Sequence, residues 1–142
     1  MQVKDLMTHQ VISIAPEETV AVAARQLARH NIGALPVCSS DGRLKGMLTD
    51  RDIVLRCIAA DQDPNTQRVS DIMSRRVVSV KPEDMAKTAS DLMSAEQVRR
   101  LPVEQDGRVI GMVALGDLAV KADCSIEASA ALSEICLNVK RK

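Results

Sequence analysis

The chain has 142 residues, and its nineteen Lys and Arg balance its nineteen Asp and Glu, so the formal net charge is zero. A chain without a basic surplus is a poor match for nucleic acid or an anionic membrane surface, because binding to either depends on an excess of Lys and Arg. It also contains no Phe, Tyr or Trp. Single-stranded nucleic acids stack on aromatic side chains, so this class of partner is disfavoured as well.

Hydrophobic residues make up 46% of the chain and charged residues 27%, the balance of a folded protein. The first residues are mixed and charged, without an apolar run long enough for a signal peptide or a membrane span, so we expect a cytoplasmic protein. No Cys-x-x-Cys pair is present, so we expect no metal site and reduced, mostly buried thiols. The four cysteines are Cys38, Cys57, Cys124 and Cys136.

The first predicted elements are a strand at residues 11–14 and a helix that follows it. Pro16 ends the strand and suits the first turn of a helix, together with Glu17 and Glu18 near its positive end. One face of this helix is apolar, formed by Val20, Ala23, Ala24, Leu27 and Ala28.

A hairpin and a second helix come next. Residues 34–38 and 44–49 are apolar and are separated by Ser-Ser-Asp-Gly-Arg, in which Gly42 supplies a positive φ angle. Residues 50–60 then form a helix. Residues 61–68 are polar and turn-prone, which suits a connection.

The same order of elements then repeats. At an offset of 66 residues, eleven of the 35 pairs from Val3 to Val37 are identical, and at an offset of 65, six of the thirteen pairs from Asp41 to Ile53 are identical. The second copy predicts a helix whose apolar face includes Met85, Ala89, Leu92 and Met93, a hairpin of residues 101–104 and 109–113 around Asp106-Gly107, and a helix at 115–122. A final helix is expected within 122–142, with Ile126, Ala130, Leu132, Ile135 and Cys136 on it.

A unit of about 60 residues cannot cover both faces of its small sheet alone. We therefore expect an α/β (α+β) fold in which two β-α-β-β-α units pack sheet to sheet about a pseudo-twofold axis, with two equivalent clefts between them. The expected organisation is a first domain at 3–60, a connection at 61–68, a second domain at 69–122 and a C-terminal helix or tail at 123–142.

The repeated phrases identify a family resemblance. They are Val-x-Asp-Leu/Ile-Met, Leu-Pro-Val, Asp-Gly-Arg and the run Gly46-Met-Leu-Thr-Asp-Arg-Asp52. In this order and spacing they resemble the CBS-domain family in the paired form called a Bateman module, over residues 3 to about 122. The runs at 31–38 and 63–66 are similar to the bacterial subgroup in which the pair is the entire protein.

This resemblance implies binding of AMP, ADP, ATP, NAD or an S-adenosyl compound as a regulatory ligand, with no catalytic cofactor. It implies that Thr49 contacts phosphate and that Asp52 holds the ribose hydroxyls. The local chemistry agrees, because Thr49 stands where a strand becomes a helix and amides converge on an anion. The alternative is that Thr49 is only a helix cap and Asp52 only a first-turn acid.

The second copy departs from this pattern. It retains Asp117, but Ala114 replaces the hydroxyl and Gly116 replaces Arg51, while Arg99 and Arg100 stand where the first copy has Gly33 and Ala34. Arginine binds phosphate bidentately, although a solvated pair of arginines is an equal alternative. The predicted ribose and phosphate contacts are Thr49, Asp50, Arg51, Asp52, Arg99, Arg100 and Asp117. The predicted adenine contacts are Ser13, Ile14, Ala34, Leu35, Pro36, Ser79, Val80, Leu101 and Pro102, most of which could instead be ordinary core residues.

An enzyme is disfavoured, because His9 and His30 belong to no catalytic or metal-spaced cluster and no phosphate loop or nucleophile elbow is present. The remaining rival is a non-catalytic interaction or scaffold protein without useful nucleotide affinity, for which Ala114 is the best support. The Bateman resemblance also implies a homodimer that pairs through helices, and twofold pairing is the commonest oligomer. A protein regulated by this module is expected, but its identity is unknown.

Overall fold

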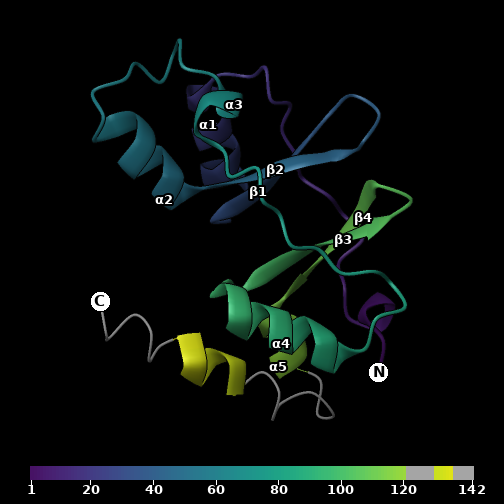
Figure 1. Ribbon diagram of the computed structural model, residues 1–142. Helices are drawn as coiled ribbons and strands as arrows, with labels where there is room; N and C mark the ends of the chain where they lie inside the picture. The colour runs from purple at the N-terminus through teal and green to yellow at the C-terminus, as the bar shows by residue number, and fades with distance from the viewer. Residues whose placement is uncertain (121–129, 136–142) are drawn as a thin grey trace. The chain divides into compact units, whose positions relative to one another are not determined.

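The structure is a computed structural model that describes residues 1–120 and 130–135. Helices alternate with two antiparallel strand pairs, β1–β2 and β3–β4, which confirms the predicted mixed α/β class (Figure 1). The elements in chain order are η1 (Val3–Asp5), α1 (Val20–His30), β1 (Ala34–Cys38), β2 (Leu44–Thr49), α2 (Asp50–Ile53), the π-helical η2 (Val54–Ile58), α3 (Val69–Ile72), α4 (Ala86–Glu96), β3 (Arg100–Gln105), β4 (Arg108–Ala114) and α5 (Leu115–Ala119).

The chain divides into two compact units. The β1–β2 unit is Ile12–Val77, and the β3–β4 unit combines Met1–Val11 with Val78–Lys142. The units therefore differ from the sequence repeats at their edges. The first residues of the chain fold with the hairpin of the second repeat, and the first residues of the second repeat fold with the hairpin of the first.

Backbone hydrogen bonds explain this exchange of leading segments. In the β1–β2 unit, Val69 N–H donates to the Glu18 carbonyl at 2.8 Å and Ser70 N–H to the Pro16 carbonyl at 3.0 Å. In the β3–β4 unit, Val3 and Lys4 N–H make the equivalent bonds, to Asp84 and Pro82 at 2.8 and 2.9 Å. Each leading segment then bridges a strand of the hairpin, through the pairs Ser74–Met47 and Thr8–Met112.

The repeated phrase Val-x-Asp-Leu/Ile-Met therefore has a packing role. Its Val and Leu or Ile are buried in both units, as Val3, Leu6, Val69 and Ile72. Its Met lies over a glycine: a Cβ added to Gly46 would meet Met73 Sδ at 2.9 Å and the Ser74 carbonyl oxygen at 2.6 Å. Gly111 faces Met7 and Thr8 in the same way. Only glycine leaves room for the segment to lie this close to the strand.

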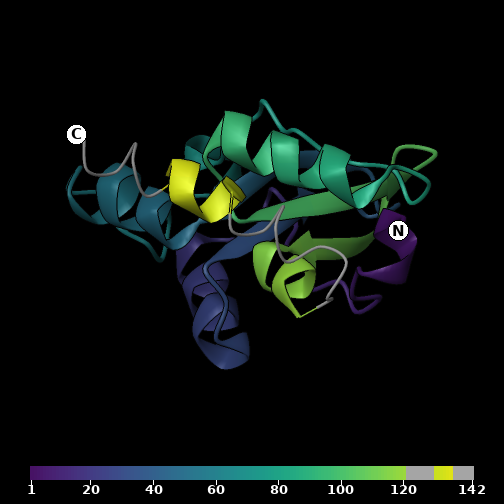
Figure 2. The same cartoon turned by 90° about the horizontal axis from the view of Figure 1, so that it is seen from below.

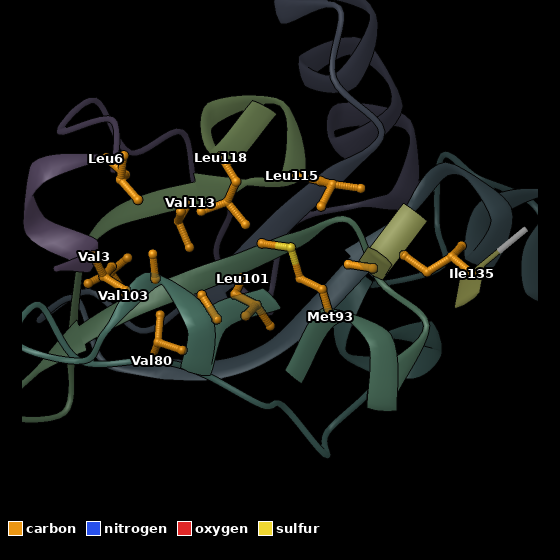
Figure 3. Close-up of a cluster of buried hydrophobic side chains, with 13 residues drawn as sticks. Val3, Leu6, Val80, Met93, Leu101, Val103, Val113, Leu115, Leu118 and Ile135 are labelled. Carbon is orange, nitrogen blue, oxygen red and sulfur yellow. The ribbon is translucent and has the colours of Figure 1, made fainter. Parts of the chain in front are cut away.

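The β3–β4 unit has its own hydrophobic core (Figure 3). The hairpin contributes Leu101, Val103 and Val113, and α4, which runs beside the hairpin in Figure 2, contributes Met93. Residues 130–135 are helical, and the buried Ala131 and Ile135 join this core, whereas Leu132 is 44% exposed. Further members are Val3, Leu6, Val80, Ala86, Ala89, Leu115 and Leu118. Ile126 and Cys136 of the predicted final helix lie outside the described residues.

The core of the β1–β2 unit is built from equivalent positions. Its members are Ile14, Val20, Ala23, Leu27, Leu35, Val37, Leu48, Ile53, Cys57, Val69, Ile72 and Met73. Both cores consist of aliphatic, Ala and Met side chains, and the core of the β1–β2 unit also contains Cys57.

The strand predicted at residues 11–14 is wrong in extent, because only Ile14 pairs, through one parallel bridge. Its N–H donates to the Pro36 carbonyl at 3.1 Å, and its carbonyl accepts from Cys38 N–H at 2.9 Å. Extending the parallel pairing in one direction would need the N–H of Pro36 as a donor, and extending it in the other direction would need the N–H of Pro16. Proline has no backbone N–H, so the pairing stops at one bridge. The other unit repeats this arrangement with Val80, Pro82 and Pro102.

The first helix begins later than predicted, at Val20 and not at Pro16. The carbonyls of Pro16 and Glu18 accept hydrogen bonds from the leading segment at 69–70, so these residues are not available for a helical turn. Thr19 caps the helix instead, its Oγ1 accepting from Val22 N–H at 3.3 Å. Of the predicted apolar face, Val20, Ala23 and Leu27 are buried, and Ala28 is exposed.

The second long helix, α4, also begins later than predicted. Met85 is the N-cap of α4 and is 50% exposed, so its predicted place on the apolar face of the helix was wrong. Ala89 and Met93 are buried as predicted, and Leu92 packs at the edge of the core.

Both hairpins form as predicted, with β1 and β2 at the expected bounds and β3 and β4 slightly longer. Gly42 and Gly107 have φ angles of 84° and 81° in the connections, as the turn chemistry requires. The helix predicted at residues 50–60 divides into α2 and η2, because Ala59 N–H donates to the Val54 carbonyl five residues earlier, at 2.8 Å. This widened turn leaves Val54, Leu55 and Ile58 about half exposed.

Candidate functional site

The turn from β2 to α2 holds the first candidate site. Thr49 is the last residue of β2 and the N-cap of α2, and its Oγ1 accepts a hydrogen bond from Asp52 N–H at 3.1 Å. Asp52 Oδ2 accepts in return from Thr49 N–H at 3.0 Å. This reciprocal capping box orients both predicted side chains at one point of the chain.

The second oxygen of Asp52 lies beside a cation. Asp52 Oδ1 is 3.7 Å from Arg56 Nη1, and the Asp52 side chain is 14% exposed. An ionised carboxylate accepts about four hydrogen bonds. Asp52 therefore has capacity for further donors, such as a pair of vicinal hydroxyl groups.

The neighbouring predicted residues surround this turn. Ala34 pairs with Thr49 across the hairpin, and Asp50 N–H donates to the Gly33 carbonyl at 3.0 Å. Asp50 Oδ1 accepts from Arg51 N–H at 2.8 Å, and both of these side chains are exposed. The hairpin thus brings Ala34, Thr49, Asp50 and Asp52 together.

The equivalent turn, from β4 to α5, lacks half of the capping box. Asp117 Oδ2 accepts from Ala114 N–H at 2.7 Å, but Ala114 has no hydroxyl to accept from Asp117 in return. Arg100 pairs with Ala114 across the hairpin, and the Arg99 carbonyl accepts from Leu115 N–H at 2.8 Å. Arg99 and Arg100 are exposed, so two cations stand beside this turn where the other hairpin has Gly33 and Ala34.

Many of the predicted adenine contacts are core residues. Ile14, Leu35, Val80 and Leu101 are at most 5% exposed and belong to the two cores. Pro36 and Pro102 are buried too, whereas Ser13, Ala34 and Ser79 are accessible to differing degrees. The Ser79 hydroxyl donates to Glu104 Oε2 at 2.5 Å. Of the predicted adenine contacts, the three accessible residues are therefore the short side chains Ser13, Ala34 and Ser79.

Two residues near these positions received no role from the sequence. Glu104 engages the Ser79 hydroxyl, and with Lys81, Pro82, Glu83, Gln105, Asp106 and Gly107 it lines a polar hollow of about 390 Å³. Arg56 contacts Asp52, and the signal that could have found it is its position four residues later on the same helical stretch.

Among the cysteines, Cys38 and Cys57 are buried as predicted, while Cys124 and Cys136 lie outside the described residues. Burial, and to a lesser degree the charge of Asp63, raises the pKa of the Cys57 thiol. A raised pKa keeps the thiol protonated and weakly nucleophilic at neutral pH. Within the described part of the chain, no group of three or more His, Cys, Asp or Glu could hold a metal ion.

The exposed hairpin connection of the β1–β2 unit contains a small polar cluster. Ser39 donates to Asp41, and Arg43 Nε is 3.2 Å from Asp41 Oδ2. The Ser39 hydrogen bond, helped by nearby backbone N–H groups and Arg43, lowers the pKa of Asp41. This cluster stabilises the hairpin turn and lies outside the predicted site.

Two hairpins that each lead into a short helix capped by an aspartate, in a duplicated chain, define a tandem of one domain type. The CBS domain model matches residues 3–58 and 69–122, so the chain belongs to the CBS domain family and contains two such domains. Among curated proteins it is 47% identical over 133 residues to the CBS domain-containing protein YhcV of Bacillus subtilis, covering 94% of each chain. It is 38% identical to hypoxic response protein 1 of Mycobacterium tuberculosis, covering 86% of this chain and 93% of that one.

Solved structures agree with these matches. The structure of hypoxic response protein I, which has two coordinated zinc ions, superposes with a TM-score of 0.78 at 38% identity and covers 84% of this chain and 97% of that one. The CBS domain pair of protein MJ0100, solved in complex with 5′-methylthioadenosine and S-adenosyl-L-methionine, has a TM-score of 0.75 at 28% identity, over 84% of this chain and 93% of that one. In the part of the chain that the structure describes, no helix has the length and apolarity needed to cross a bilayer.

Proposed function

We propose that this protein is a non-catalytic regulatory module of the cytoplasm that binds an adenine nucleotide through Asp52 and the β2–α2 turn. The observation that carries the proposal is the Asp52 carboxylate, which one backbone N–H orients and which retains acceptor capacity for ribose hydroxyls. Adenosyl ligands bound to the CBS pair of MJ0100 support the class of ligand. AMP, ADP, ATP, NAD and S-adenosyl compounds are the candidates.

The β4–α5 turn is proposed as a second, altered site. Asp117 supplies the same carboxylate, and the exposed Arg99 and Arg100 supply charge for a phosphate in place of the missing hydroxyl. We expect this turn to favour ligands with more phosphate charge than the β2–α2 turn does.

Calorimetric titration with AMP, ATP, NAD and S-adenosylmethionine tests the proposal. Asp52→Asn and Asp117→Asn retain an oxygen that can accept the capping N–H but lose the negative charge. We expect about a tenfold or greater loss of affinity at the site that each carboxylate serves, because a hydrogen bond to a charged group is lost.

A matched control comes from α3. Asp71 Oδ2 caps Arg68 N–H at 3.1 Å, as Asp52 caps Thr49, but Asp71 is not part of the proposed site. Asp71→Asn should leave the titrations unchanged. If none of the four compounds binds the wild type, the proposal is wrong and the scaffold alternative is favoured.

The proposal includes self-association into a homodimer. Val54, Leu55 and Ile58 are 55%, 49% and 54% exposed on one helical stretch, an apolar surface of the kind that interfaces bury. Leu55→Glu should lower the molar mass measured by light scattering from that of a dimer to that of a monomer. A monomeric wild type would contradict this part of the proposal and leave the nucleotide site standing.

A regulatory role further requires the ligand to bind two states unequally, since only a difference in affinity moves an equilibrium. Small-angle scattering with and without saturating ligand measures that difference. Superposable curves would limit the protein to binding without a change of shape.

A further inference from the structure

Arg56 lies in the helical stretch after β2 and contacts two different parts of the β1–β2 unit. Its Nη1 is 3.7 Å from Asp52 Oδ1, and the same nitrogen donates to the carbonyl of Ile72 at 2.9 Å. Neither the repeat pattern nor the family resemblance assigned a role to this residue.

The Asp52 carboxylate is therefore held from two sides. Thr49 N–H binds Oδ2 at 3.0 Å, and the Arg56 guanidinium stands beside Oδ1. The hydrogen bond to Oδ2 and the positive charge beside Oδ1 together favour one orientation of the carboxylate about its Cβ–Cγ bond. An acceptor that is already oriented loses less conformational entropy when a ligand binds.

Arg56 is itself anchored, although its side chain is 51% exposed. Ile72 is the last residue of α3, and the next residues lead to Ser74, which exchanges two backbone hydrogen bonds of 2.9 Å with Met47 of β2. The carbonyl at the end of α3 thus belongs to a segment that the strand already holds in place. A cation hydrogen-bonded to such a carbonyl keeps its position better than a free surface side chain does.

We propose that Arg56 is a positioning residue that sets how strongly Asp52 discriminates a ribose from a 2′-deoxyribose. It acts by holding Oδ1 toward the ligand while Thr49 N–H holds Oδ2. This inference depends on the proposed nucleotide binding at Asp52. It predicts an effect on the sugar hydroxyls and none on the adenine or the phosphate.

The test compares the affinities of AMP and ATP with those of their 2′-deoxy forms by calorimetric titration. In wild type the ribose forms bind more tightly. Arg56→Met keeps the length of the side chain but removes its charge and its donors, so the ribose preference should fall by about two- to fivefold, within the range for a partly exposed ion pair. The deoxy forms should bind as before, and Arg56→Lys should restore part of the preference.

Arg75 is the matched control. Its Nη2 donates to the Ser70 carbonyl in the same segment at 3.2 Å, and Arg75 is not part of the proposed site. Arg75→Met should leave the ribose preference unchanged. In an Asp52→Asn background, Arg56→Met should have no further effect on the preference, because the two residues act through one another.

Four outcomes overturn the inference. An equal loss for ribose and deoxyribose forms would assign Arg56 a purely structural role, and an unchanged preference would assign it none. A wild type that binds only NAD or S-adenosylmethionine also overturns it, with the proposed function intact. A wild type that binds none of these compounds overturns the proposed function as well.

Discussion

Both strand-to-helix turns of this protein are capped by an aspartate, but only one of them has both hydrogen bonds of the capping box. At the β2–α2 turn Thr49 and Asp52 cap each other, whereas at the β4–α5 turn Asp117 caps Ala114 and receives nothing from its side chain. The turn that lost the hydroxyl has arginines at 99 and 100, where the other has Gly33 and Ala34. Duplication preserved the backbone and the carboxylate, and it left the surrounding charges free to diverge.

The comparison also separates packing residues from candidate binding residues. Core positions stay apolar in both units, as the buried pairs Val3 and Val69 and Leu6 and Ile72 show. At the turns the aspartate is kept, but the residue that precedes it by three changes from Thr49 to Ala114. Substitutions at paired positions therefore test whether the two units depend equally on the same contacts.

The largest effect is expected from the leading segments. Leu6→Ala and Ile72→Ala remove buried side chains at equivalent positions, 6% and 3% exposed. Each should lower the free energy of unfolding by about 2–5 kcal/mol, because a cavity remains in the core. Urea denaturation followed by circular dichroism measures the loss, and a much smaller effect at Leu6 would mean that the N-terminal segment contributes little to the β3–β4 unit.

A second pair tests the close approach of each leading segment to its strand. Gly46→Ala and Gly111→Ala place a Cβ 2.6 Å from a backbone carbonyl oxygen, of Ser74 and Thr8 respectively. We expect each to destabilise by about 1–3 kcal/mol through overpacking. Gly116→Ala is the control, because nothing lies within 4 Å of its added Cβ and it is in a helix, so about 0.5–1 kcal/mol of stabilisation is expected.

A third substitution restores the missing half of the capping box. In Ala114→Thr the new hydroxyl can accept a hydrogen bond from Asp117 N–H, which should stabilise the protein by about 1 kcal/mol. Thr49→Ala removes the equivalent hydrogen bond and should destabilise the protein by about the same amount. Thermal unfolding measures both. If Ala114→Thr instead destabilises, the β4–α5 turn has adapted to alanine, and its difference from the β2–α2 turn is structural.

The smallest effect concerns pH and Cys57, whose counterpart Ala122 lies outside the described residues. The folded protein raises the pKa of this thiol above the ordinary 9.0, so the folded state holds the thiol proton more tightly than the unfolded chain does. The resulting stability is complete below the ordinary pKa and is lost as the pH rises through the raised value. Urea midpoints from about pH 8 to about pH 10 should therefore fall less steeply in Cys57→Ala than in wild type.

Much of the architecture could be predicted from local patterns. The hairpins followed from alternation and from Asp-Gly turns, and Gly42 and Gly107 have the positive φ angles that this turn chemistry demands. The late start of α1 was missed because carbonyls of residues 16 and 18 bind a segment some fifty residues away. No local propensity contains that information.

The local part of the candidate site could also be predicted from the sequence. Thr49 and Asp52 cap each other, an arrangement that both the binding prediction and its helix-cap alternative allow. The role of Ile14 or Leu35 in holding an adenine stays a prediction, and their burial gives each an equally direct role in the core. Arg56 escaped notice because its second contact, the Ile72 carbonyl, lies on another segment of the fold.

The exchange of leading segments determines where a fragment that contains one unit should begin and end. A fragment chosen from the sequence periodicity, beginning at Val3 and stopping before Val69, would carry the closing piece of the absent hairpin and lack its own. A fragment of Ile12–Val77 would include the backbone partners that the described residues provide for its hairpin, among them Ser74 of the leading segment. The compact units are therefore offset from the sequence repeat by the length of one leading segment.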